Sequence, residues 1–354
     1  MRGIPNYLQG CPFSSILASL ICCAIMVSEK WSGEAFAGAI TFGSGSNQFS
    51  VEFAHIGSPG NTADTTGRPN PAGAVAYDYY IGKYEISRDM VEKYNTSYGT
   101  QSSLVISMHD MTNEGGNGAN KPAAGVSWNE AARFVNWLNT SKGYAAAYKF
   151  TTGGVNDNVE VWSISDAGFD PVNPFRNRNA MFVLPTTDEW YKAAFFDPVS
   201  NAYFDYTTGS DSLPTPVGSG TSPGTAVYNQ GHSQGPADIY SAGGLSPFGV
   251  MALGGNVGEW EETSKDGLNS SGAARRGLRG GIWSSSYGFL SSAVRFDDIP
   301  SIDQSQNTTV GFRVVSLGAP PSASVPEPGT LLLLGAGLGG IGGRRLKRWC
   351  SGRC

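Results

Sequence analysis

The residues best suited to carry chemistry are unevenly spread along this chain of 354 residues. All of its cysteines lie near the two ends, and residues 24–349 contain none. They are Cys11, Cys22, Cys23, Cys350 and Cys354. The long central part therefore has no thiolate nucleophile, no internal disulfide and no cysteine ligands for zinc or an iron–sulfur cluster.

The histidines do not form a metal-binding motif. His55, His109 and His232 are far apart in the sequence, and no HExxH or similar two-histidine spacing occurs. They could converge in the folded chain, but three unrelated loop histidines are the favoured interpretation.

Two further polar groups could act in a site. Residues 284–286 are three serines, but no G-x-S-x-G turn surrounds them and no histidine is near, so a solvated loop is favoured over a nucleophile. Asp297, Asp298 and Asp303 could form a pair of carboxylates or an ion site. Acidic residues on a solvent-exposed loop are the favoured interpretation.

The composition limits the classes of protein to consider. There are 24 Lys and Arg against 29 Asp and Glu, a net charge of -5, so no basic surface for nucleic acid is expected. Aromatic residues make up 11% of the chain, which argues against general disorder. The 48 glycines and 20 prolines indicate a loop-rich fold.

A few short elements must position these groups. Ser127 and Glu130 form a capping box that predicts a helix over Trp128–Thr140, with apolar residues at helical spacing and Gly143 beyond its end. Thr186 and Glu189 predict a second helix in the same way. Ser87 can cap a short helix that ends at Tyr94. We expect strands within 38–56, 77–86, 159–164, 181–184, 278–283, 293–296 and 310–315. Together they predict one α+β domain with long loops.

The N-terminus is typical of a secretory signal peptide over residues 1–37. Arg2 precedes an apolar stretch at 12–27, and an A-x-A cleavage pattern ends at Ala37. A membrane anchor is the alternative, although the apolar stretch is short for a span.

The C-terminus has the pattern of a stop-transfer segment. Residues 326–328 read Pro-Glu-Pro, residues 329–343 are apolar and glycine-rich, and four basic residues follow within 344–348. This order resembles the PEP-CTERM sorting signal of Gram-negative bacteria, here at 326–354 after a linker at 317–325. The resemblance implies an exosortase-type processing enzyme as a partner, membrane attachment before processing, and a place at the cell surface, outer membrane or extracellular matrix. A plain anchor is the alternative.

Six ordered sequence blocks lie between residues 76 and 316. They read YIGKYEI at 80–86, GVSWNEA at 125–131, LPTTDEWYKAA at 184–194, GGNVGEW at 254–260, RGGIW at 279–283 and GFRV at 311–314. Their order resembles the formylglycine-generating enzyme, or sulfatase-modifying factor, family. The resemblance implies a C-type-lectin-like α+β fold over 76–316, preceded by a strand and loop extension at 38–75.

The same resemblance implies an oxidation that turns a substrate cysteine into formylglycine with O₂ and copper. The family's two copper-binding cysteines fall on Ser285 and Leu290. A hydroxyl is a poor ligand for Cu(I) and leucine is none, so copper and this reaction are not expected. Relatives that are iron-dependent sulfoxide synthases use histidines of an additional helical domain. No such domain is recognised in this sequence, so their activity is not expected either.

Calcium is the other metal that the resemblance implies. The 254–260 loop resembles a calcium loop in which Glu259 would give a carboxylate, and Gly255 and Val257 would give backbone carbonyls. A usual side-chain ligand is replaced by Ala252. A metal-free turn is the alternative.

The family's substrate groove falls on Trp283, Tyr287, Phe289 and Arg295. Aromatic and arginine side chains often dominate recognition, although Trp283 could be core and Arg295 a structural ion pair. We therefore expect an exported, non-oxidase module that binds an extracellular peptide, glycan or matrix component. The alternatives are a divergent oxidoreductase that uses another metal or cofactor, and a purely structural matrix protein.

Overall fold

A computed structural model describes residues 36–302 and 309–320. The expected sorting signal and Asp303 lie outside the described residues, and so does the expected signal peptide except for residues 36 and 37, which begin the first strand. Within the described ranges, no helix combines the length and apolar composition that a membrane crossing needs.

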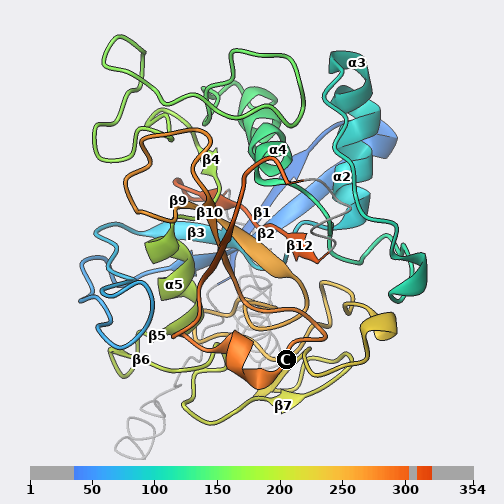
Figure 1. The fold of residues 1–354 in the computed structure, drawn as a ribbon, viewed down its shortest axis with the longest axis vertical. Helices are drawn as coiled ribbons and strands as arrows, with labels where there is room; N and C mark the ends of the chain where they lie inside the picture. Colours follow the sequence, from blue (N-terminus) through green and yellow to red (C-terminus); the bar gives the residue numbers. More distant parts are fainter. Residues whose placement is uncertain (1–35, 303–308, 321–354) are drawn as a thin grey trace, which may run out of the picture. The chain divides into compact units, whose positions relative to one another are not determined.

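One antiparallel sheet joins the two ends of the described chain (Figure 1). Its order is β1 (Phe36–Phe42), β2 (Phe49–Ile56), β3 (Tyr79–Gly82), β13 (Val315–Ser316) and β4 (Phe182–Val183). The register places Val315 opposite both Ile81 and Val183, so the last strand lies between two much earlier ones. The expected strands at 38–56, 77–86 and 181–184 are confirmed, although the last two are shorter than predicted.

A second sheet carries most of the charged side chains discussed below. Its order is β11 (Phe296–Asp298), β10 (Arg276–Arg279), β9 (Gly258–Ser264) and β12 (Val310–Gly311), with β9 and β12 parallel. Two small sheets pair β5 (Phe196–Asp197) with β6 (Ala202–Tyr203), and β7 (Thr215–Pro216) with β8 (Thr225–Ala226).

The two predicted capping boxes are present, and both helices follow them. Ser127 begins α4 (Trp128–Thr140) and Thr186 begins α5 (Thr187–Phe195). Ser87 caps α2 (Arg88–Tyr94), as predicted. The remaining helical segments are α3 (Thr100–Ser102), η1 (Gly45–Asn47), η2 (Asn95–Gly99), η3 (Met111–Asn113), η4 (His232–Gln234) and η5 (Tyr287–Leu290).

The main core lies where α4 packs on the first sheet. Phe134 and Trp137 of α4 contact the ring of Phe49, at centroid distances of 6.1 and 5.9 Å. Phe42 meets Phe182 edge to face at 5.2 Å, which joins β1 to β4. Aromatic packing therefore holds α4 against the first sheet. Figure 1 shows long loops around this small amount of regular structure.

Four strand predictions need correction. The strand expected at 278–283 is β10, which ends at Arg279, and the one expected at 310–315 is two short strands, β12 and β13. The 159–164 segment is not a strand, because only Glu160 forms a bridge, to Lys149, before the chain turns at Ser163. Ile164 is 91% exposed, so the apolar pattern there does not mark a core. The strand expected at 293–296 begins at Phe296 instead. The α+β class and the loop-rich architecture are confirmed.

Candidate functional site

Strand β9 has three glutamates, Glu259, Glu261 and Glu262, and all three are fully buried. Burying a carboxylate costs several kcal/mol unless it is paired and hydrogen-bonded. Each of these glutamates has an arginine partner from a distant part of the sequence.

Glu259 pairs with Arg313, and both side chains are fully buried. Arg313 Nε donates to Glu259 Oε2 at 2.6 Å, and a second guanidinium nitrogen bonds to Oε1. Trp190 of α5 also donates its indole N–H to Glu259 Oε2, at 2.7 Å. Both carboxylate oxygens are therefore engaged.

Glu261 is held by two arginines. Arg279 Nε and Arg295 Nε donate to its two oxygens at 2.5 and 2.7 Å, and Thr187 adds a hydroxyl donor at 2.7 Å. Burial opposes ionisation of Glu261, but Arg279 and Arg295 outweigh it and hold the pKa of this carboxyl below its usual value.

Arg176 bridges Glu262 and Glu189. Its Nε lies 3.0 Å from Glu262 Oε2, and its two terminal nitrogens lie 3.0 and 2.9 Å from the oxygens of Glu189. Burial opposes the charge of Arg176, but the two carboxylates raise its pKa well above the ordinary value. This bridge links β9 to the start of α5 and is structural.

These contacts test the expected calcium loop. The Glu259 carboxylate is neutralised by Arg313 and does not fit the role of a calcium ligand. Gly255, at a φ of +89°, is required because a Cβ there would lie 2.1 Å from the carbonyl oxygen of Val227. Gly255 and Val257 could supply only backbone oxygens, so calcium in this loop stays a prediction.

The loop instead holds neighbouring segments together. Gly255 N–H donates to the carbonyl of Gly280, and Asn256 accepts from the N–H of Trp283, at 2.8 and 2.9 Å. Asn256 Nδ2 donates to Glu85 at 2.6 Å. Burial and the nearby Glu259 raise the pKa of Glu85 to about 8.

The two positions that the resemblance assigns to copper ligands have other roles. Ser285 Oγ accepts from the N–H of Ile282 at 3.0 Å. Leu290 is buried in a small apolar cluster with Tyr206, Ala226 and Tyr228. Ser285 thus stabilises a turn, and Leu290 is part of a small apolar core. Among the described residues, no group of three or more His, Cys, Asp or Glu side chains is placed to hold a metal ion.

The expected groove residues are only partly brought together. Phe289 and Arg295 line one pocket of about 380 Å³, together with Arg68 and Phe296. The rings of Phe289 and Phe296 stack at 5.4 Å and remain 42% and 45% exposed. We call this the 288–296 pocket.

Tyr287 and Trp283 lie outside the lining of the 288–296 pocket. Tyr287 is exposed on η5, next to the pocket in sequence. Trp283 is fully buried and donates its indole N–H to the carbonyl of His232 at 3.0 Å.

Sequence reasoning missed Arg68 and Phe296 as pocket residues. Arg68 lies in a loop that no motif marks, and its backbone carbonyl accepts from Arg279. Phe296 follows directly after Arg295, and an aromatic residue next to an arginine is the signal that the sequence offers.

Comparisons with known proteins agree with this architecture. No curated protein matches the sequence. In fold, the chain is similar to Treponema denticola variable protein 1, with a TM-score of 0.52 and 18% identity over 80% of this chain and 99% of that one. It is also similar to CarF, with a TM-score of 0.52 and 18% identity over 75% of this chain and 98% of that one. These likenesses concern the fold alone.

Two sequence families match this chain. Residues 324–348 match the PEP-CTERM protein-sorting motif, which indicates export, surface sorting in Gram-negative bacteria and processing by exosortase-type machinery. Residues 37–317 match the Sulfatase-modifying factor enzyme 1-like domain, and this chain belongs to that family.

Proposed function

We propose that this protein is a non-oxidase binding module, displayed outside the cell, that captures a peptide, glycan or matrix component at the 288–296 pocket. The absence of cysteine from residues 24–349 carries the proposal. A copper oxidase of this family needs soft sulfur ligands, and the two corresponding positions hold Ser285 and Leu290. Their contacts, a turn and a buried apolar cluster, support structural roles.

The 288–296 pocket supports binding. Phe289 and Phe296 present a stacked, half-exposed aromatic pair, and Arg68 adds a cation at the edge. Arg295 lines the pocket, but its guanidinium forms an ion pair with Glu261. We therefore assign it a structural role in the pocket wall and not a contact with the ligand. Exposed aromatic side chains supported by a rigid scaffold are typical of recognition surfaces.

The sorting motif supports the place where such a module would act. A protein handled by an exosortase-type enzyme is delivered across the inner membrane, so its ligand is an extracellular one. We extend this to residence on the outer membrane, at the cell surface or in the extracellular matrix. Calcium, where bound through the carbonyls of Gly255 and Val257, would have a structural role only.

The experiment that tests the proposal is a screen on printed peptide and glycan arrays. The wild-type protein should give hits that Phe289→Ala and Phe296→Ala abolish. Val199→Ala is the matched control, because Val199 is an exposed apolar residue on the β5–β6 turn and outside this pocket. Array hits that both phenylalanine variants still give would contradict binding at the 288–296 pocket.

A further inference from the structure

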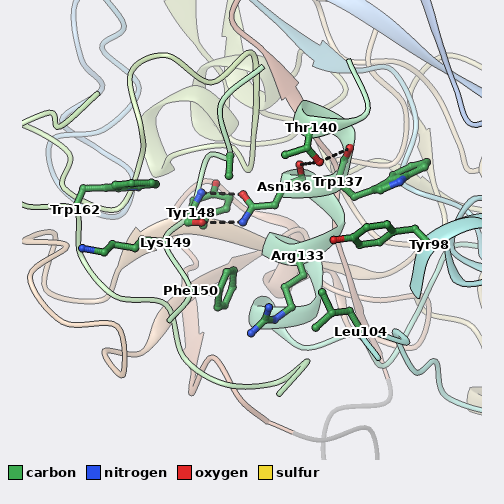
Figure 2. Close-up of a pocket in the computed structure, with 11 residues that line it drawn as sticks. Tyr98, Leu104, Arg133, Asn136, Trp137, Thr140, Tyr148, Lys149, Phe150 and Trp162 are labelled. Carbon is green, nitrogen blue, oxygen red and sulfur yellow. Dashed lines mark hydrogen bonds between the residues drawn. The ribbon is translucent and has the colours of Figure 1, made fainter. Parts of the chain in front are cut away.

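A second pocket lies against α4 and shares no residue with the 288–296 pocket. Its volume is about 290 Å³, close to the lower end of the range for small-molecule sites. Figure 2 shows Trp162 and Lys149 on one side, Tyr98 on the other, and Arg133 and Phe150 between them. We call this the α4 pocket.

The walls of the α4 pocket are fixed by hydrogen bonds. Asn136 of α4 donates to the carbonyl of Tyr148 at 2.8 Å and accepts from the N–H of the same residue at 2.9 Å (Figure 2). Trp162 Nε1 donates to the carbonyl of Ala147 at 3.0 Å. The helix and the facing loop are therefore tied together, and the indole of Trp162 is held through its ring nitrogen.

Arg133 supplies a positive charge that forms no close ion pair within the described residues, and the carboxylate that acts on it, Asp157, does so from a longer distance. It is only 7% exposed, and its hydrogen bonds all go to carbonyl oxygens, those of Thr152, Gly154 and Val155. Its guanidinium carbon lies 3.8 Å from the centroid of Phe150. Among the described residues, Nη1 has no hydrogen-bond partner, and no carboxylate lines the pocket. An anion placed here would gain a charge-assisted hydrogen bond.

Two further donors complete the lining. Lys149 Nζ lies 6.0 Å from the centroid of the Trp162 ring and pairs with Asp166 at 2.9 Å, which leaves other ammonium hydrogens for a ligand. Tyr98 packs its ring against Tyr94 at 5.7 Å. Figure 2 shows the Tyr98 hydroxyl pointing into the pocket, and no hydrogen bond to it is found within the described residues.

From these contacts we infer that the α4 pocket binds a carboxylated sugar, a uronate unit of an acidic glycan. The sugar ring stacks on Trp162 and Phe150, and its carboxylate accepts from Arg133 Nη1 and the Tyr98 hydroxyl. A pocket of this volume takes a compact ring more readily than an extended peptide. The inference stands independently of the 288–296 pocket.

The test is calorimetric titration of the full-length protein with digalacturonate and with galactobiose, its uncharged counterpart. Digalacturonate should bind at least about tenfold more tightly, the difference that one charge-assisted hydrogen bond supplies. Its affinity should fall modestly as salt is raised, because salt screens the charge of Lys149, whose side chain is partly exposed, more than that of the buried Arg133.

Three variants locate the site. Tyr98→Phe removes only a hydroxyl and should weaken digalacturonate binding about fivefold, without changing thermal unfolding. Trp162→Ala should weaken it by about tenfold or more, and Trp162→Phe, which keeps a stacking face, should retain most of the affinity. Tyr144→Ala is the control, because Tyr144 is an exposed aromatic residue in the loop after α4 that also carries Lys149, but it does not line the α4 pocket.

Four results would overturn the inference. The first is no digalacturonate binding at millimolar concentration, and the second is equal affinity for galactobiose. The third is a triglutamate peptide that displaces digalacturonate at equal concentration, which would assign the pocket to acidic peptides. Wild-type affinity in both Tyr98→Phe and Trp162→Ala would also contradict it.

Discussion

Glu259 and Arg313 form an ion pair in which neither side chain is exposed to solvent. Glu259 lies on β9 of the second sheet, and Arg313 lies between β12 and β13, just before the chain enters the first sheet. Arg313 also donates to the carbonyls of Gly82 and Met251, at 2.8 and 3.0 Å. This buried ion pair thus connects the two sheets. Glu259, the one carboxylate that the family resemblance assigns to calcium, therefore stabilises the fold instead.

Removing one partner should therefore destabilise the fold strongly. Glu259→Gln leaves the Arg313 guanidinium buried without its counter-charge, and we expect a loss of about 3–5 kcal/mol in the free energy of unfolding. Arg275→Gln is the control, because Arg275 pairs with Asp297 at the surface and should contribute under about 1 kcal/mol. Urea denaturation of both variants measures the difference. A loss below 1 kcal/mol for Glu259→Gln would contradict the structural role.

The stability of the protein should also depend on Glu85. Burial and Glu259 raise its pKa to about 8 in the folded chain, against 4.5 as the ordinary value. The folded state therefore keeps a proton that the unfolded state releases between these two values. The contribution of this bound proton to the free energy of unfolding is complete below pH 4.5. It is lost as the pH rises toward 8, by up to about 1.4 kcal/mol per pH unit.

The measurement is the free energy of unfolding at several pH values for the wild type and Glu85→Gln. The variant has no titrating group at this position, so the difference between the two proteins should change steadily from pH 5 to pH 8. A difference that stays constant over this range would show that Glu85 is ionised in the folded protein.

Leu290 should behave as a core residue. Leu290→Ala leaves a cavity in its cluster with Tyr206 and Tyr228, and we expect a loss of about 2–5 kcal/mol. Ile164→Ala, at a position that is almost fully exposed, should change stability by less than about 0.5 kcal/mol. Thermal unfolding compares the two. Equal melting temperatures would mean that the Leu290 side chain is not packed as described.

The stacked rings of Phe289 and Phe296 should stabilise each other in the folded protein. A double-mutant cycle with Phe289→Ala and Phe296→Ala should give a coupling free energy of about 0.5–1.5 kcal/mol, the value typical of a stacked aromatic pair. Urea titrations of the single and double variants provide it. No coupling would mean that the two rings are not stacked in solution.

Short sequence patterns predicted the helices and strands whose formation depends on residues close together in the chain. The capping residues Ser127 and Thr186 placed α4 and α5 almost to the residue, because a cap and its partner are only three positions apart. Strand alternation likewise indicated strands within 38–56, where β1 and β2 lie, but it did not place the turn between them. The α+β class followed from these few elements and the high glycine and proline content.

The buried charges could not be predicted in the same way. The β9 sequence, GEWEETS, is polar by composition, and a polar strand is expected to face solvent. It is buried because Arg176, Arg279 and Arg313 reach it from other parts of the chain. Such pairing depends on tertiary structure, and this is also why Phe289 and Arg295 share a pocket while Trp283 does not.

The central claim is that this family member has no copper oxidase centre. The most direct measurement uses the full-length protein with its five cysteines, all near the two ends, changed to serine, so that no thiol of the chain itself can hold copper. This protein is incubated with Cu(I), O₂ and a sulfatase-motif peptide that contains cysteine, followed by mass spectrometry of the peptide and elemental analysis of the protein. We predict an unmodified peptide and no stoichiometric copper, because Ser285 and Leu290 offer no soft ligand. Formylglycine in the peptide, or one copper per chain, would contradict the account.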